Sequence, residues 1–344
     1  MGLPATAILL HAVGQELCQQ GQLGAALAHY EGALARLPPG HAHVASLRTA
    51  LGQLLARVGR HAEAAEHLEE ALRLKASAFN PGHPYIAFTL AALGESLHAL
   101  ERHAEALDAY TRALAVLERR LGPLSPRALA CHLALGRLHA ARGEAEPARA
   151  HIERILASAN FGLGDARQLG LAQHTLGQIA HLQGRPAEAL AHLRRALTEL
   201  EPVLDPQSPD LLALLHDYGR ALHRSGDHDG ALAAFSRALA GQRSAHGSET
   251  PAAATLLNAM GQVLYTQGKL GPALDHYHQA FELRQRILGP DHPQTITSRF
   301  NCGTAMRQLG DPFGRAEMES AAEALTERLG PDHPHVRALQ SWLR

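Results

Sequence analysis

Eight apolar–glycine or aromatic–glycine pairs recur along the chain at a nearly constant interval, and this spacing constrains the fold more than any other feature. Successive glycines are 38, 42, 42, 41, 42, 42 and 42 residues apart. A period of about 40 residues indicates a repeat architecture in which each repeat packs only on its neighbours. The glycines are Gly14, Gly52, Gly94, Gly136, Gly177, Gly219, Gly261 and Gly303.

Other residue types recur at fixed distances from these glycines. A second glycine follows seven residues later in every repeat except one, where Glu101 takes its place. In the first seven repeats alanine follows after twelve residues, a bulky side chain after sixteen and, mostly, alanine after nineteen. Spacings of three, four and seven are helical, so each repeat is predicted to be two amphipathic helices joined by a tight turn. The first glycine permits close helix packing, and the second ends the first helix.

The composition fits many small helix–helix contacts and excludes several classes of function. Hydrophobic residues make up 46% of the chain but aromatic residues only 4%, and the formal net charge is -1. This charge gives no electrostatic footprint for nucleic acid or a membrane surface. Three scattered cysteines, Cys18, Cys131 and Cys302, indicate a reducing compartment, and no apolar run is long enough to span a bilayer. We therefore expect a cytoplasmic protein.

The repeated residues resemble the tetratricopeptide repeat in its long form of about 42 residues. Linkers such as Gly289-Pro290-Asp291-His292-Pro293 are similar to those of kinesin light chains. The resemblance implies an all-α fold: a right-handed α-solenoid superhelix of eight helix pairs with a C-terminal capping helix. It implies one solenoid domain over 1–344, with repeats at approximately 3–38, 41–80, 83–122, 125–160, 166–204, 208–246, 250–289 and 292–330 and a cap at 334–344.

Some features depart from this pattern. Kinesin light chains carry paired asparagines just before the apolar–glycine pair, whereas here only Asn258 and Asn301 match, so motor binding does not transfer. The eighth repeat is degenerate, with Arg315 where alanine is expected, and Trp342 is expected to plug the cap. The connection over 160–165 is the least regular, and we expect the weakest joint of the solenoid there.

The resemblance also implies that the first helix of each pair lines the inner face. The 40 positions that would face inward include five arginines, six histidines and one acid, Glu95. The groove is therefore predicted to be mildly positive. A GC-rich genome that replaces lysine and asparagine codons would give the same richness in arginine and histidine, and this alternative stays open.

Two groups of inward positions are candidate peptide-binding sites. The first group combines histidines seven residues apart with arginine, which binds carboxylate or phosphate through paired hydrogen bonds. Histidines stacked at about 10 Å are too far apart for one metal ion, so we expect no metal there. The group contains His174, Gln178, His181, His216, Arg220, His223 and Arg224.

The second group lies in the last two repeats. Its aromatic residues are typical binding anchors, and its amides could hold an extended peptide backbone. Tyr265 and Phe300 could instead pack against neighbouring helices. The group contains Asn258, Gln262, Tyr265, Phe300, Thr304 and Arg307.

No motif for catalysis, nucleotide binding or metal binding is present, so we expect no enzyme, no catalytic residue and no cofactor. The sequence predicts a protein-interaction scaffold that binds an extended acidic peptide in its groove, with a protein or peptide as partner. The alternative is a regulatory or sensor subunit that binds a small anionic ligand or a signalling peptide. Binding that weakens strongly with salt would favour an ionic groove.

Overall fold

The computed structural model describes residues 3–41, 43–159, 161–163 and 165–343, and these ranges contain helices and no strands. The prediction of an all-α fold is confirmed. Asn160 and Gly164 of the irregular connection lie outside the described residues, as does Arg344 at the end of the expected cap. None of the described helices combines the length and apolarity that a membrane span requires.

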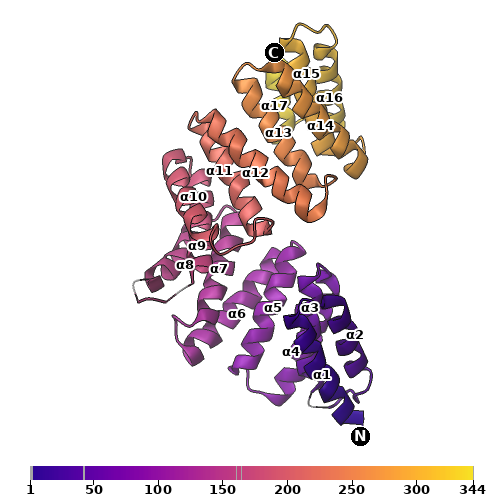
Figure 1. Cartoon of the computed structure of the whole chain (residues 1–344), viewed down its shortest axis with the longest axis vertical. Coiled ribbons are helices and arrows are strands. Elements are labelled where there is room, and N and C mark those ends of the chain that lie inside the picture. Colours follow the sequence, from indigo (N-terminus) through magenta and orange to yellow (C-terminus); the bar gives the residue numbers. More distant parts are fainter. Residues whose placement is uncertain (1–2, 42, 160, 164, 344) are drawn as a thin grey trace. The chain divides into compact units, whose positions relative to one another are not determined.

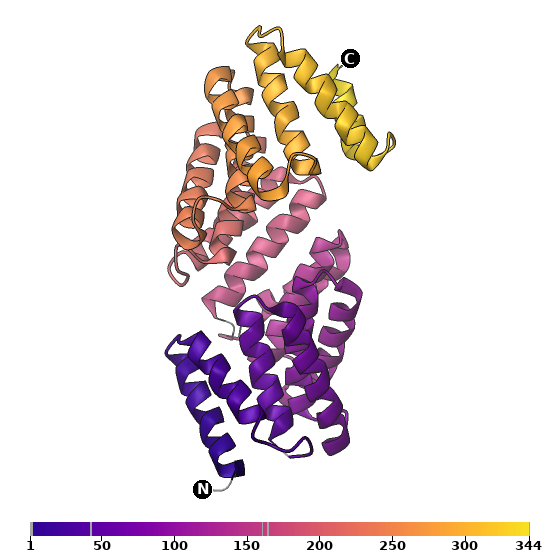
Figure 2. The ribbon, with the colours of Figure 1, turned by 90° about the vertical axis from the view of Figure 1, so that its right-hand side faces the viewer.

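The chain divides into two compact units, residues 1–168 and 169–344. The division falls in the first turn of α9, shortly after the irregular connection. Within each unit, successive helices form antiparallel pairs that stack side by side (Figures 1 and 2). The helices of the first unit are α1 (Leu3–Gln19), α2 (Leu23–Leu34), α3 (Val44–Arg57), α4 (His61–Ala78), α5 (Pro84–Ala99), α6 (His103–Leu121), α7 (Pro126–Ala141) and α8 (Ala145–Ala159).

The second unit continues the same alternation of first and second helices. Its helices are α9 (Ala166–Leu182), α10 (Pro186–Leu200), α11 (Pro209–Arg224), α12 (His228–His246), α13 (Pro251–Thr266), α14 (Leu270–Leu288), α15 (Pro293–Gln308), α16 (Gly314–Leu329) and α17 (Pro334–Leu343).

The first glycine of each repeat is where the two helices of a pair meet. The bulky residue of the second helix packs directly on it, so that a Cβ at the glycine would lie 2.5–3.0 Å from that side chain. Such distances are too short for carbon atoms, and only glycine allows this approach. At Gly177, for example, the Cβ would lie 2.6 Å from Leu193 Cγ.

The start of a first helix is encoded locally. Several first helices begin with proline, whose missing N–H costs nothing in the first turn. The residue before it caps the helix: Ser125 Oγ accepts from the amide of Ala128, and Thr250 Oγ1 accepts from that of Ala253. These caps fix the register in which the first helix presents its side chains.

The turn between paired helices needs a left-handed residue. The second glycines have φ between +69° and +87°, and Glu101 occupies the same conformation with φ of 60°. The conformation is unfavourable for a side chain at this position. The repeat with Glu101 nevertheless makes the same turn, so packing of the flanking helices overrides the local preference.

The eighth repeat is complete but its second helix is shifted by one residue. Met318 packs on Gly303, and Gly314 lies against the backbone of Arg307, where a Cβ would be 2.3 Å from its nitrogen. Arg315 is exposed. The expected degeneracy therefore reflects a change of register.

The capping helix packs differently from the prediction. Val336 of α17 is fully buried in a cluster with Ile296, Phe300 and Met318, whereas Trp342 is 54% exposed. The sequence predicted Trp342 as the plug, and the structure corrects this. Val336, Leu339 and Leu343 of α17 pack on the last helix pair, and about half of the Trp342 side chain stays exposed.

The packing predicts a large effect of filling one helix glycine. We expect Gly177→Leu to lower the free energy of unfolding by about 1–3 kcal/mol or more, because the new side chain overlaps Leu193. Gly271 is the matched control, since it is helical, lies in the same unit and has no atom within 4 Å of an added Cβ. Thermal unfolding followed by circular dichroism should show a lower midpoint for Gly177→Leu and no loss for Gly271→Leu. Equal midpoints would contradict the proposed packing.

Candidate functional site

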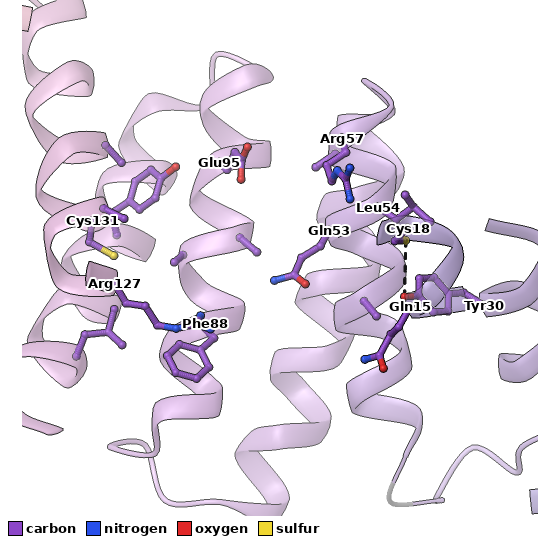
Figure 3. A pocket seen from close by; sticks show the side chains of 18 of the residues that line it. Gln15, Cys18, Tyr30, Gln53, Leu54, Arg57, Phe88, Glu95, Arg127 and Cys131 are labelled. Atoms are coloured by element: carbon purple, nitrogen blue, oxygen red, sulfur yellow. Dashed lines mark hydrogen bonds between the residues drawn. The ribbon is translucent and has the colours of Figure 1, made fainter. Parts of the chain in front are cut away.

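A groove of about 760 Å³ lies along the first helices of the first unit. The helices α1, α3, α5 and α7 supply most of its lining, and second helices contribute Tyr30, Tyr110 and Leu117. Figure 3 shows the side chains that face it. Its size lies within the range of pockets that bury a drug-sized ligand. The inner face of this unit therefore has room for part of a partner molecule.

Six alanines are among the side chains that line the groove. The alanines belong to α3, α5 and α7, and the larger Phe88 and Leu54 also line the groove (Figure 3). An alanine leaves open the space that a longer side chain would fill. The alanines are Ala50, Ala56, Ala91, Ala92, Ala130 and Ala134.

The charged groups of the groove are two arginines and one acid. The guanidinium of Arg127 lies 3.9 Å from the centre of the Phe88 ring, a cation–π contact that holds it in place. Arg57 and Glu95 lie towards the opposite edge (Figure 3). In the part of the chain that the structure describes, neither Arg57 nor Arg127 forms an ion pair. Both guanidinium groups can therefore bind an anion.

Polar groups complete the lining at the N-terminal end. Gln15 and Gln53 follow the first glycine of their repeats directly, in register with Glu95. Cys18 Sγ lies 3.8 Å from Tyr30 Oη. The three register-matched side chains can hydrogen-bond to the backbone of a bound chain.

A buried lysine contacts the groove-lining helices α3 and α5, and no carboxylate of the described residues pairs with it. Lys75 Nζ donates to Thr49 Oγ1 over 2.9 Å, to Thr89 Oγ1 over 2.7 Å and to Tyr85 O over 3.4 Å. Each threonine hydroxyl donates its own proton to a helical carbonyl, so it can accept from the lysine. Burial lowers the pKa of Lys75 to about 8.

The second unit repeats this arrangement with arginine. Arg284 Nη1 donates to Ser298 Oγ over 2.7 Å and to Gln294 O, and Nη2 donates to Thr255 Oγ1. Burial lowers the pKa of Arg284 as well. Lys75 and Arg284 both stand 23 residues after the first glycine of their repeats. In both, a cation of the second helix joins the first helices of two consecutive repeats.

The predicted group of histidines and arginines is partly occupied by an acid of the protein itself. His174 Nε2 lies 2.9 Å from Asp217 Oδ2, Gln178 Nε2 donates to the same oxygen, and His216 Nδ1 lies 3.4 Å from Oδ1. Burial opposes ionisation of Asp217, but these hydrogen bonds outweigh it and hold its pKa well below the usual range. The expected anion site at His174, Gln178 and His216 is corrected accordingly, because a carboxylate already lies there.

The rest of that group keeps an exposed cationic surface. Arg220 Nη2 donates to His181 Nε2 over 3.2 Å, and burial together with Arg220 and Arg224 lowers the pKa of His181. Burial also lowers the pKa of His223, which lies beside His228. Arg220 and Arg224 are exposed and form no ion pair among the described residues. The described residues of the chain contain no cluster of three or more side chains able to hold a metal ion.

The second predicted group is not assembled as one surface. Phe300 is 2% exposed in the core beneath the capping helix, which corrects its expected role as a binding anchor. Tyr265 is half-buried against a core cluster, and Asn258 accepts a hydrogen bond from Asn301 over 2.8 Å. Arg307 donates to Trp342 O, so only Gln262 is left exposed without such a contact.

Three charged residues of these sites were missed from the sequence. Arg127 and Lys75 lie outside the expected inward positions, and Asp217 stands two residues before a glycine, a position that holds alanine in most repeats. The lysine carried one usable signal, because it is one of only two lysines and falls in the apolar register of a second helix.

Comparison with known proteins agrees with this architecture. The family model described as tetratricopeptide repeat matches residues 43–119, 85–160, 168–244, 216–285 and 251–312. No curated protein matches the sequence significantly.

Several solved structures share the fold at low sequence identity. A tetratricopeptide repeat protein from Parabacteroides merdae has a TM-score of 0.57 at 16% identity, covering 88% of this chain and 99% of that chain. BtubC (BKLC) from P. vanneervenii has a TM-score of 0.56 at 19% identity, with coverages of 69% and 94%. PilF from Pseudomonas aeruginosa has a TM-score of 0.51 at 19% identity, with coverages of 74% and 97%.

The burial of Lys75 predicts a pH dependence of stability. Between about pH 8 and pH 10.5 the unfolded chain binds a proton at this lysine that the folded chain has lost, so the stability from this group rises with pH. Relative to Lys75→Met, the wild type should gain about 2 kcal/mol of unfolding free energy between pH 7 and pH 9.5.

The control variant is Lys269→Met, because Lys269 is the other lysine of the chain and is exposed. Urea unfolding at several pH values measures the difference. A constant difference between the wild type and Lys75→Met across this range would refute the assignment.

Proposed function

Because the chain belongs to the tetratricopeptide-repeat family, we propose that it is a scaffold that holds an extended, acidic segment of a partner protein on the inner face of its first unit. Tetratricopeptide repeats generally bind proteins and are generally non-catalytic. The observation that carries the proposal is the groove of about 760 Å³ whose two arginines, Arg57 and Arg127, have no carboxylate partner within the described ranges of the chain.

The charges of the groove favour an acidic segment. Arg127 is held over Phe88, so its guanidinium loses little freedom when it binds a carboxylate. Glu95 is the single acid of the lining, against two arginines. Burial of an anionic side chain beside a preplaced guanidinium is favourable because the hydrogen bonds are charge-assisted.

The polar row favours an extended segment. Gln15, Gln53 and Glu95 recur at one position of three successive repeats and all line the groove. An extended chain has unpaired backbone groups that need hydrogen-bond partners, and a row of such side chains supplies them. A small anion would contact only one of these side chains, so the row supports a peptide over the small-ligand alternative.

The exposed arginines of the second unit offer a second contact of the same chemistry. Arg220 and Arg224 stand one turn apart on α11 and present guanidinium groups to solvent. We propose the cytoplasm as the site of action, in keeping with three free cysteines.

Charge reversal in the groove tests the function. The full chain is used to capture proteins from a lysate of its own organism, and the captured proteins are identified by mass spectrometry. We expect Arg57→Glu with Arg127→Glu to lose the main captured protein and to weaken binding of its purified acidic segment at least tenfold. The control is Arg194→Glu with Arg195→Glu, which makes the same charge change on α10, outside the groove.

Salt dependence separates the proposal from its alternatives. The affinity for the purified segment should fall as the salt concentration rises, because ionic contacts are screened. The double variant Arg220→Glu with Arg224→Glu measures how much the exposed arginines of the second unit contribute to this affinity. The proposal is wrong if the Arg57 and Arg127 variant binds like the wild type, or if the captured segment has no acidic residues.

A further inference from the structure

The inner faces of the two units differ at one pair of positions, three and two residues before the first glycine. In the second unit these positions form polar bridges between the fifth and sixth repeats and between the seventh and eighth repeats, whereas the seventh repeat has Ala259 at the second of these positions. His174 lies 2.9 Å from Asp217, and Asn301 Nδ2 donates to Asn258 Oδ1 over 2.8 Å. Both bridges join residues 43 apart, so they are the same contact in two places. A polar side chain fills the space between adjacent first helices there.

In the first unit the position two residues before the first glycine carries no polar side chain. The residue two before the glycine is alanine in the second, third and fourth repeats, and all three alanines line the groove. The partners that would complete a bridge are His11, Thr49 and Ala91. No such bridge forms among the described residues of this unit. The alanines therefore leave hollows where the second unit has bridges.

Apolar groups form part of the walls of these hollows. Their walls include the alanine methyls, Leu54 and Phe88, which neither donate nor accept hydrogen bonds. A polar side chain of the bound segment that packs on these groups would lose its hydrogen bonds to water without replacement. An apolar side chain would be removed from water at no such cost.

We propose that Ala50, Ala92 and Ala134 determine the specificity of the groove by admitting apolar side chains of the bound segment. This inference rests on the proposed function and sharpens it. The occupant is an extended segment of a partner protein in which apolar side chains enter the hollows between acidic ones. Its backbone lies along Gln15, Gln53 and Glu95, and its acids reach Arg57 and Arg127.

A residue that already occurs at this position in another repeat can be used to fill one of the hollows. Ala92→Asn places at the third repeat the residue that Asn301 provides at the eighth, and the facing residue Thr49 is polar, as Asn258 is for Asn301. Ala259→Asn is the matched control, because Ala259 occupies the same position of the seventh repeat and does not line the groove. Ala50→Asn is a second closing variant, and circular dichroism melting checks that each variant is folded.

The probe is a phage-displayed library of random twelve-residue peptides, selected on the full wild-type chain. We expect enriched peptides to combine apolar with acidic residues. The best peptide is then synthesised, and its affinity is measured by titration calorimetry. Ala92→Asn and Ala50→Asn should each weaken it at least tenfold, whereas Ala259→Asn should change it less than twofold.

The outcomes separate this inference from the proposed function. Enriched peptides that bind Ala92→Asn and Ala50→Asn as well as the wild type overturn the role of the alanines and leave the scaffold function standing. Enriched peptides with apolar residues but no acids overturn the acidic preference alone. A library that yields no peptide above background overturns both.

Discussion

The contact between a glycine of each first helix and a bulky side chain of the second helix is the interaction on which each unit depends. It brings the paired helices so close that no Cβ fits between them. Because the glycine fixes which side of the first helix is covered, it also fixes which side is left uncovered. The side chains before and after the glycine then fall in a constant register on the inner face, repeat after repeat.

Residues at equivalent positions of the repeats make different contacts in the two units. At the position two residues before the glycine, the first unit has alanines that line a groove, and the second has Asp217 and Asn301, which bridge neighbouring helices. The buried cations Lys75 and Arg284, in contrast, recur in both units with hydroxyl and carbonyl partners. The buried cation therefore recurs in both units, while the residue two before the glycine differs between the open groove of the first unit and the two bridged pairs of repeats in the second.

The sequence predicted the helices, turns and pairing because these depend on residues close together in the chain. Gly177 and Leu193, for example, lie in one repeat. The sites were predicted less well because they depend on the spacing between repeats. Asp217 reaches His174 across 43 residues, and Phe300 is buried by a helix that follows its own pair. Alanine gave no signal for the groove, because a missing side chain matters only once its neighbours are placed.

The most direct test of the account is nuclear magnetic resonance of alanine methyl groups, recorded while a binding peptide is added to the full chain. The methyls of Ala50, Ala92 and Ala134 should shift as the peptide saturates the protein. Those of Ala64, Ala106 and Ala148, buried between paired helices, should shift far less. Shifts confined to second helices or to the second unit would contradict the claim that the alanine-lined inner face of the first unit is the binding surface.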